Sequence, residues 1–315
     1  MSIAFVFPGQ GSQAVGMGKS LADSFASARA VFDEVDSALG QKLSDLMWNG
    51  PEEQLTLTEN AQPALMAVSL AAMRVLEVEH GITVANIATC VAGHSLGEYS
   101  ALAAAGTFTL ADTARLLKIR GRAMQLATPV GTGAMAALLG LDFKTASEVA
   151  AEAAQGDVCQ AANDNSDGQV VISGAKAAVD RALDIAKAKG AKRAILLPVS
   201  APFHCALMQP AAEAMREALA KAAMRDPVVP VIANVVAGAL TDAADIRQRL
   251  VEQVTGTVRW RECVYAMSDL GVKVFVEVGN GKVLTGLAKK NAPEAKAIAV
   301  GNADDVAAVV GVLRG

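Results

Sequence analysis

The sequence is poor in the residues that build metal sites and disulfide frameworks. Its 315 residues include only 4 cysteines and 3 histidines. The cysteines are far apart and form no CxxC pair, at positions 90, 159, 205 and 263. Such spacing disfavours disulfides, and with so few histidines it also disfavours a zinc site. We therefore expect buried thiols and no bound metal.

Long hydrophobic runs and an excess of positive charge are also missing. No apolar run approaches the roughly 18–20 residues of a membrane span. The N-terminus lacks a basic segment before an apolar core, so we expect no signal peptide. The net charge is −4, which disfavours nucleic acid as the main partner. These absences predict a cytoplasmic protein without membrane contacts, with a monomer as the default state.

Hydrophobic residues, in contrast, are abundant at 52%, which is enough for one large domain or for a large and a small one. Strand-like runs occur at 3–7, 87–92, 228–233 and 273–278. Helical patterns occur at 19–39, 63–79, 96–105 and 110–125, the first as one amphipathic helix. Their alternation is typical of a parallel sheet covered by helices.

The middle of the chain has a different order of elements. Strand-like runs at 134–139, 158–163, 169–173 and 194–199 surround helical patterns at 143–154 and 175–189. This order is βαββαβ, the ferredoxin-like pattern. Segments rich in Gly, Pro and Ser flank it. We predict a large α/β domain of residues 1–126 and 199–315, with an inserted ferredoxin-like domain of residues 127–198.

A glycine-rich segment, FPGQGSQAVGMGKS at 7–20, follows the first predicted strand. Its spacing resembles both a dinucleotide-binding turn and the tail of a P-loop. Gln13 stands where a P-loop needs a glycine, and no second strand ends on an acidic residue about 20 residues later. We therefore predict no nucleotide site here, and a flexible loop between strand and helix is the alternative.

The segment Gly93-His94-Ser95-Leu96-Gly97 lies between a strand-like run and a helical pattern. G-x-S-x-G in this context is typical of a nucleophile elbow, so we predict an α/β-hydrolase-like core with Ser95 as the nucleophile. The backbone N–H of Leu96 can then donate to an oxyanion. A serine that only caps the helix is the alternative.

A serine nucleophile needs a base, and three histidines are available. His80 ends a helical pattern just before a glycine, and His94 lies inside the elbow with its side chain directed elsewhere. By elimination the base is His204, in the loop SAPFH after a predicted strand. A buried structural histidine is the alternative. Spacing does not identify the group that orients this imidazole, which can be an aspartate or a backbone carbonyl.

Several longer motifs occur in order along nearly the whole chain, namely FPGQGSQ, AQPAL, GHSLGEYSAL, RGRAMQ, SAPFH and EVGNGKVLTGL. Together they resemble the malonyl-CoA:acyl carrier protein transacylases of bacterial fatty acid synthesis, to which the acyltransferase domains of polyketide synthases are related. The resemblance implies transfer of malonyl from malonyl-CoA to the phosphopantetheine thiol of acyl carrier protein. It implies no cofactor, because the CoA thioester is a substrate.

The resemblance also implies roles for individual residues. Ser95 would carry the malonyl ester, and His204 would be its general base and acid. The backbone carbonyl of Gln253 would hold the histidine. The backbone N–H groups of Gln10 and Leu96 would form the oxyanion hole.

Arg120 would pair with the free carboxylate of malonate, because a guanidinium binds a carboxylate through a planar two-point fork. From spacing alone, Arg120 would instead be a surface residue of the basic stretch LLKIRGR. The lesser candidates for lining the site are Gln62, His94 and Asn163.

Three other functions remain compatible with these residues. The carrier could serve polyketide rather than fatty acid synthesis. The same dyad could belong to a serine thioesterase or hydrolase, which would release free acid without a thiol acceptor. A non-catalytic protein that docks the carrier is the third possibility, and it would form no acyl-serine.

Overall fold

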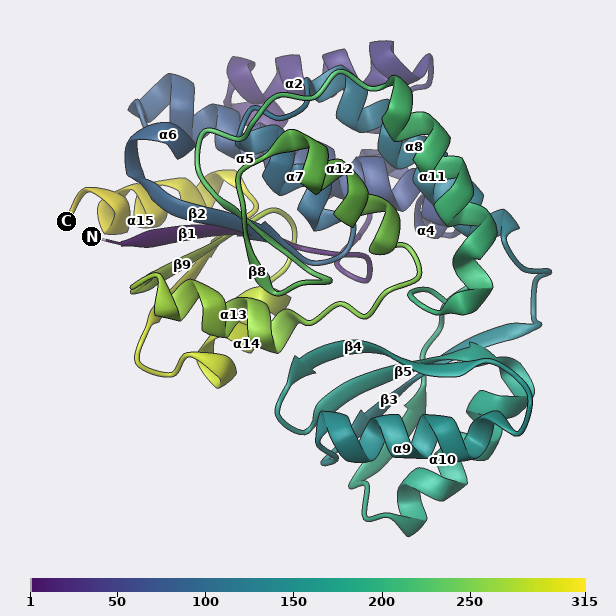
Figure 1. The fold of residues 1–315 in the computed structure, drawn as a ribbon. Coiled ribbons are helices and arrows are strands. Elements are labelled where there is room, and N and C mark those ends of the chain that lie inside the picture. Colours follow the sequence, from purple (N-terminus) through teal and green to yellow (C-terminus); the bar gives the residue numbers. More distant parts are fainter. Residues whose placement is uncertain (1) are drawn as a thin grey trace.

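The computed structural model describes residues 2–315, and its core is a six-stranded sheet (Figure 1). The strand order is β10-β9-β1-β2-β7-β8, in which the first five strands are parallel and β8 runs antiparallel to β7. The strands are β1 (Ile3–Phe7), β2 (Ala88–Gly93), β7 (Val231–Ala233), β8 (Gly238–Leu240), β9 (Val274–Val278) and β10 (Lys296–Val300). The prediction of an α/β fold with a parallel sheet is confirmed.

Helices cover both faces of this sheet, which is why its inner strands are largely apolar rather than alternating. On β1, Phe5 and Phe7 face the cluster around α5 and α7, whereas Ala4 and Val6 face α13 and α14 (Figure 1). The helices are α1 (Lys19–Ser24), α2 (Ala26–Leu39), α3 (Leu43–Asn49), α4 (Glu52–Thr56), α5 (Thr58–His80), α6 (Val84–Ile87), α7 (Gly97–Ala104), α8 (Leu110–Leu126), α9 (Phe143–Ala154), α10 (Lys176–Ala188), α11 (Gln209–Lys221), α12 (Ala243–Glu252), α13 (Trp260–Asp269), α14 (Val283–Asn291) and α15 (Ala303–Arg314).

A second sheet is built from the middle of the chain. Its strands are β3 (Gly133–Leu139), β4 (Cys159–Ser166), β5 (Gln169–Ala175) and β6 (Arg193–Leu196). They are antiparallel in the order β4-β5-β3-β6, with α9 and α10 packed on one face over a separate apolar core (Figure 1). The elements follow one another as βαββαβ. The domain boundaries at 126/127 and 198/199 stay a prediction.

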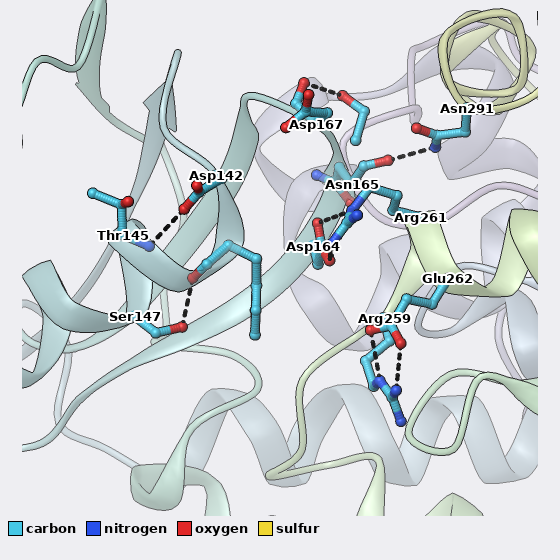
Figure 2. Close-up of polar contacts among 12 residues, drawn as sticks. Asp142, Thr145, Ser147, Asp164, Asn165, Asp167, Arg259, Arg261, Glu262 and Asn291 are labelled. Carbon is cyan, nitrogen blue, oxygen red and sulfur yellow. Dashed lines mark hydrogen bonds and ion pairs between the residues drawn. The ribbon is translucent and has the colours of Figure 1, made fainter.

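Strand β4 is the edge that joins the second sheet to the rest of the protein. Asn163 pairs with Val258 in an isolated parallel bridge. Next to it, Asp164, whose side chain is almost fully buried, forms an ion pair of 2.8 Å with Arg261 (Figure 2). The Asn291 side chain donates a bond of 2.9 Å to the Asn165 carbonyl (Figure 2). Residues 163–165 are therefore held firmly against the segments that lead into α13 and end α14.

Two expectations were wrong. The single helix predicted for 19–39 is broken at Phe25, whose φ of −134° and ψ of 121° are extended. Phe25 packs against the core in this conformation, so packing overrides the helical pattern. The second expectation was that no apolar run approaches the length of a membrane span. By length and composition, α5 is long and apolar enough to cross a membrane. However, 83% of its apolar stretch is buried inside the protein.

Candidate active site

The turn between β2 and α7 is sterically possible only with its two glycines. A Cβ on Gly93 would lie 1.9 Å from the Gly97 carbonyl carbon, and one on Gly97 would lie 2.2 Å from the Phe7 oxygen. Between them, Ser95 has a φ of 54°, a left-handed conformation that is costly for a residue with a side chain. This geometry is that of a nucleophile elbow, which presents the serine Oγ at the end of the strand.

His204 completes a short chain of hydrogen bonds with the serine. Its Nε2 lies 2.7 Å from Ser95 Oγ, and its Nδ1 lies 2.9 Å from the backbone carbonyl oxygen of Gln253. Since a carbonyl only accepts, Nδ1 carries the proton and Nε2 is free to accept the serine proton. Burial and then the charge of Arg120 lower the pKa of His204 to about 3. The imidazole is therefore neutral at pH 7 and able to act as a base.

Arg120 is fully buried beside the serine rather than exposed, so the interpretation from spacing alone was wrong. Its Nη1 donates to Gln62 Oε1 at 2.9 Å. Its Nη2 donates to Gln253 Oε1 at 2.8 Å and to Ser95 Oγ at 3.2 Å. Within residues 2–315, these neutral acceptors hold the guanidinium and no carboxylate forms an ion pair with it. Its charge therefore remains available for an anionic ligand.

The glycine-rich loop lies directly on the elbow. The Phe7 carbonyl accepts from His94 N–H at 3.0 Å, and a Cβ on Gly9 would lie 2.9 Å from the His94 oxygen. In the part of the chain that the structure describes, the backbone N–H groups of Gln10 and Leu96 donate to no protein acceptor. Two free donors beside the nucleophile are what an oxyanion hole requires.

Neighbouring side chains shape this loop. Gln13, which stands where a P-loop would need a glycine, accepts from the Gly11 N–H at 2.8 Å and closes a tight turn. The Asn280 side chain donates to the Ser12 carbonyl at 2.5 Å. Gln13 and Asn280 therefore give the loop a defined shape.

Comparison with known proteins agrees with this geometry. The model of the acyl transferase domain family matches residues 4–314. The malonyl CoA-acyl carrier protein transacylase of Bacillus subtilis is 46% identical over 313 residues, which cover 99% of this chain and 97% of that protein. The chain belongs to this transacylase family.

Solved structures extend the comparison to the fold. The acyl-carrier-protein-S-malonyltransferase from Bartonella henselae is 56% identical, with a TM-score of 0.97 and 100% of both chains covered. A malonyl-transacylase in complex with its type II PKS acyl-carrier protein is 43% identical, with a TM-score of 0.95. The match covers 99% of this chain and 100% of that one.

The lesser candidates for lining the site, Gln62, His94 and Asn163, differ in how close they lie to Ser95. Gln62 contacts Arg120 directly, as described above. His94 points away from Ser95, because its Nε2 lies 2.9 Å from Asn165 Oδ1 on β4. The side chain of Asn163 forms no hydrogen bond within residues 2–315, and its backbone pairs with Val258. His94 and Asn163 therefore line the junction with the second sheet rather than contact the nucleophile.

Sequence reasoning missed two residues of the site. Asn234, after β7, accepts the Ser95 N–H at 2.8 Å through Oδ1 and donates to the Gly93 carbonyl at 2.8 Å. Glu98 lies one helical turn after Ser95 and accepts from the Asn234 N–H at 2.9 Å. Glu98 belongs to the motif GHSLGEYSAL, so the motif could have indicated it. Asn234 lies 139 residues from Ser95, and no local signal indicates it.

Proposed function

We propose that this chain transfers the malonyl group of malonyl-CoA to the phosphopantetheine thiol of acyl carrier protein through a malonyl ester on Ser95. One observation carries the proposal: Ser95 Oγ lies 2.7 Å from the base His204 and 3.2 Å from the buried cation Arg120. Malonyl has a thioester carbonyl and a carboxylate separated by one CH₂ group. A nucleophile next to a cation suits an acyl group of this kind.

In the first half-reaction, His204 Nε2 takes the Ser95 proton as Oγ attacks the thioester carbon. The negative charge that develops on the carbonyl oxygen is stabilised by the N–H groups of Gln10 and Leu96. The carbon–sulfur bond then breaks, and CoA leaves as the thiol with the proton from His204. The carrier's thiol repeats these steps on the malonyl ester and restores the serine hydroxyl. No metal or redox cofactor takes part.

Arg120 makes the reaction selective for the malonyl group. It binds the malonyl carboxylate, and its contact with Ser95 Oγ brings that carboxylate close to the reacting ester. Acetyl has no charge to pair with the guanidinium and would leave a buried cation without an anion. We therefore expect malonyl to be preferred at both half-reactions.

We also propose a finer description of the fold, with two domains. The elbow at the end of β2 and the parallel sheet support an α/β-hydrolase-like core for residues 1–126 and 199–315. The antiparallel βαββαβ sheet supports a ferredoxin-like domain within residues 127–198. The cytoplasmic location, the monomeric state and the absence of membrane contacts stay predictions.

Fatty acid synthesis is the pathway we favour. The alternative is a polyketide carrier, which one specific observation supports, namely the relative in complex with a type II PKS acyl-carrier protein. Parallel assays with both kinds of carrier would separate the two, because the preferred carrier should accept malonyl faster.

The proposed function is tested by intact-mass measurement after brief exposure of the chain to malonyl-CoA. We expect one malonyl group on the wild type and none on Ser95→Ala. Ser100→Ala is the matched control, because Ser100 is a buried serine on the helix that follows the elbow. No malonyl adduct, or an equal adduct on Ser95→Ala, would refute the nucleophile. Rapid release of malonate without a thiol acceptor would indicate a hydrolase instead.

A further inference from the structure

One buried carboxylate near the site takes no part in the proposed reaction. Glu98 lies in the first turn of α7, and only 1% of it is exposed. Its Oε2 accepts from the Gln253 side chain at 3.0 Å and from the Asn234 N–H at 2.9 Å. A buried carboxylate is costly unless it is well bonded, and no cation contacts this one among residues 2–315. Packing alone does not explain a carboxylate in this position.

The Gln253 side chain connects Glu98 to the site. Its Oε1 accepts from Arg120 Nη2 at 2.8 Å, and its Nε2 donates to Glu98 and, at 3.0 Å, to the Ser95 carbonyl. Reversing the amide would set its NH₂ group against the guanidinium and its oxygen against acceptors. The acceptor on Glu98, together with the Ser95 carbonyl and Asn234 Oδ1 at 3.3 Å, therefore fixes which end of the Gln253 amide faces Arg120, and Glu98 is the one charged acceptor of the three.

Gln253 also contacts the base, through its main chain. Its carbonyl accepts from His204 Nδ1 at 2.9 Å. One residue thus holds Arg120 with its side chain and His204 with its backbone. Glu98 touches the side chain only, so removal of its acceptor should affect Arg120 more than His204.

We propose that Glu98 is a positioning residue, which acts through the Gln253 side chain to hold Arg120 in the orientation that receives the malonyl carboxylate. This inference rests on the proposed function. It assigns Glu98 to substrate selectivity, not to proton transfer.

The surroundings of Glu98 give it a charge that can change near neutral pH. Burial raises the pKa of Glu98 to about 7, while its N–H donors and Arg120 act in the opposite direction. The other titratable groups that face it are Tyr99 on α7 and Cys263 on α13. Burial raises the pKa of both, so they stay neutral at pH 7. Burial also lowers the pKa of both His94 and His204, and that of His204 to about 3, so His204 does not change charge between pH 6 and 8.

The test measures the rates at which malonyl-CoA and acetyl-CoA acylate Ser95, by intact mass, between pH 6 and 8. Glu98→Met has a similar length without an acceptor, whereas Glu98→Gln keeps an acceptor oxygen without charge. We expect Glu98→Met to reduce the malonyl-to-acetyl rate ratio about tenfold or more, as for removal of one hydrogen bond to a charged group. Glu98→Gln should retain most of the ratio.

The pH dependence of the ratio separates positioning from general destabilisation. In the wild type the ratio should rise from pH 6 to pH 8, because an ionised carboxylate is the stronger acceptor. In Glu98→Gln it should be flat and close to the wild-type value at pH 6. Gln253→Met removes the side-chain link but keeps the main-chain carbonyl. If Glu98 acts through that link, Glu98→Met should cause little further decrease of the ratio in this background.

Several outcomes would overturn the inference. Equal decreases of malonyl and acetyl transfer in Glu98→Met would show a structural role only, as would full additivity with Gln253→Met. If Glu98→Met does not fold, a wild-type ratio that is flat with pH and equal to that of Glu98→Gln still refutes the inference. A wild-type chain that takes up no malonyl at all refutes the proposed function, and the inference with it.

Discussion

Replacing Arg120 with alanine should abolish the preference for malonyl over acetyl. The guanidinium is buried and reaches Ser95 Oγ at 3.2 Å. A carboxylate one CH₂ group from the ester carbon therefore lies within reach of the same Nη2 group or of its neighbour. The variant has no cation in this position, so malonyl would bring an unpaired negative charge into a buried site.

The magnitude follows from the hydrogen bonds that the alanine variant cannot make to the malonyl carboxylate. A hydrogen bond to a charged group contributes about 1.5–3 kcal/mol, so a two-point pairing with carboxylate contributes about 3 kcal/mol or more. This corresponds to a decrease of about 10²-fold or more in kcat/KM for malonyl-CoA. Removing Arg120 also leaves Gln62 Oε1 and Gln253 Oε1 without their donor. That cost is common to both substrates, so the malonyl-to-acetyl ratio isolates the effect on recognition.

The assay is the rate of acyl-Ser95 formation from malonyl-CoA and acetyl-CoA, measured on the same preparation. Arg115→Ala is the matched control, since Arg115 lies on the same helix, is half exposed and pairs with Asp112. The control should leave both rates within a factor of about two, as is usual for surface substitutions. An equal decrease of both activities in Arg120→Ala would refute a role in recognition and indicate that Arg120 only supports the structure.

Three further predictions concern the base and the glycine loop. Because the pKa of His204 is lowered to about 3 from its usual 6.5, kcat/KM for acetyl-CoA, which makes no contact through a carboxylate with Arg120, should stay level from pH 7 down to about pH 5. A decline centred at 6.5 in this pH–rate profile would contradict the burial argument. The same shift should reduce the contribution of His204 to the free energy of unfolding as pH falls below 6.5, since His204 binds a proton there only in the unfolded chain. The raised pKa of Glu98 acts in the opposite direction, so urea unfolding of Glu98→Gln, which lacks that carboxyl, measures the His204 effect. Gln10→Ala should slow acylation less than Gly9→Ala, because the Gln10 side chain makes only a 3.4 Å contact with Thr58 whereas a Cβ on Gly9 would lie 2.9 Å from the His94 oxygen. Similar decreases in the two variants would show that the Gln10 side chain matters as much as the backbone shape of the loop, which would contradict this expectation.

Local patterns were sufficient to predict the strands of both sheets apart from β8 and β10, whereas the helices from α11 onward were given no ranges. The second sheet illustrates this, because its turn-rich segments separate short apolar runs. The length and spacing of these runs distinguish the strands from the two helices. The elbow was also predictable, since its two glycines and the serine lie within five residues. The break at Phe25 was not predictable, because helical spacing continues across it and only packing against the core reveals the extended residue.

Contacts between distant residues explain what the sequence could not define. Arg120 was assigned to the substrate by resemblance alone, because no pattern in its helix distinguishes a buried arginine from a solvated one. The group that orients His204 is the backbone carbonyl of Gln253. Every residue has a backbone carbonyl, so no residue type in the sequence indicates which one acts. Asn234 and Gln253 reach the elbow from 139 and 158 residues away.

The neutral partner of His204 has a chemical consequence. Burial and the charge of Arg120 lower the pKa of His204, and the hydrogen bond to the Gln253 carbonyl offsets them only in part. A carboxylate at Nδ1 would stabilise the imidazolium more strongly than this carbonyl does. A weak base is sufficient here, because both half-reactions involve a thiol with a pKa near 8.5. In the first, the CoA thiol leaves with less help from an acid than an amine needs. In the second, the carrier's thiol attacks with less help from a base than an alcohol needs, and His204 returns the proton to the departing Ser95 oxygen. The arrangement suits exchange between thioesters rather than cleavage of amides.

The same low pKa connects recognition of malonyl with the chemical step. After burial, the charge of Arg120 is the largest cause that lowers the pKa of His204. A malonyl carboxylate bound to Arg120 would offset that charge, which would raise the pKa of His204 and make the imidazole a stronger base. Acetyl brings no such charge and leaves the base weak. We therefore expect malonyl to be favoured in kcat as well as in KM, since its carboxylate would both anchor the acyl group and strengthen the base that deprotonates Ser95.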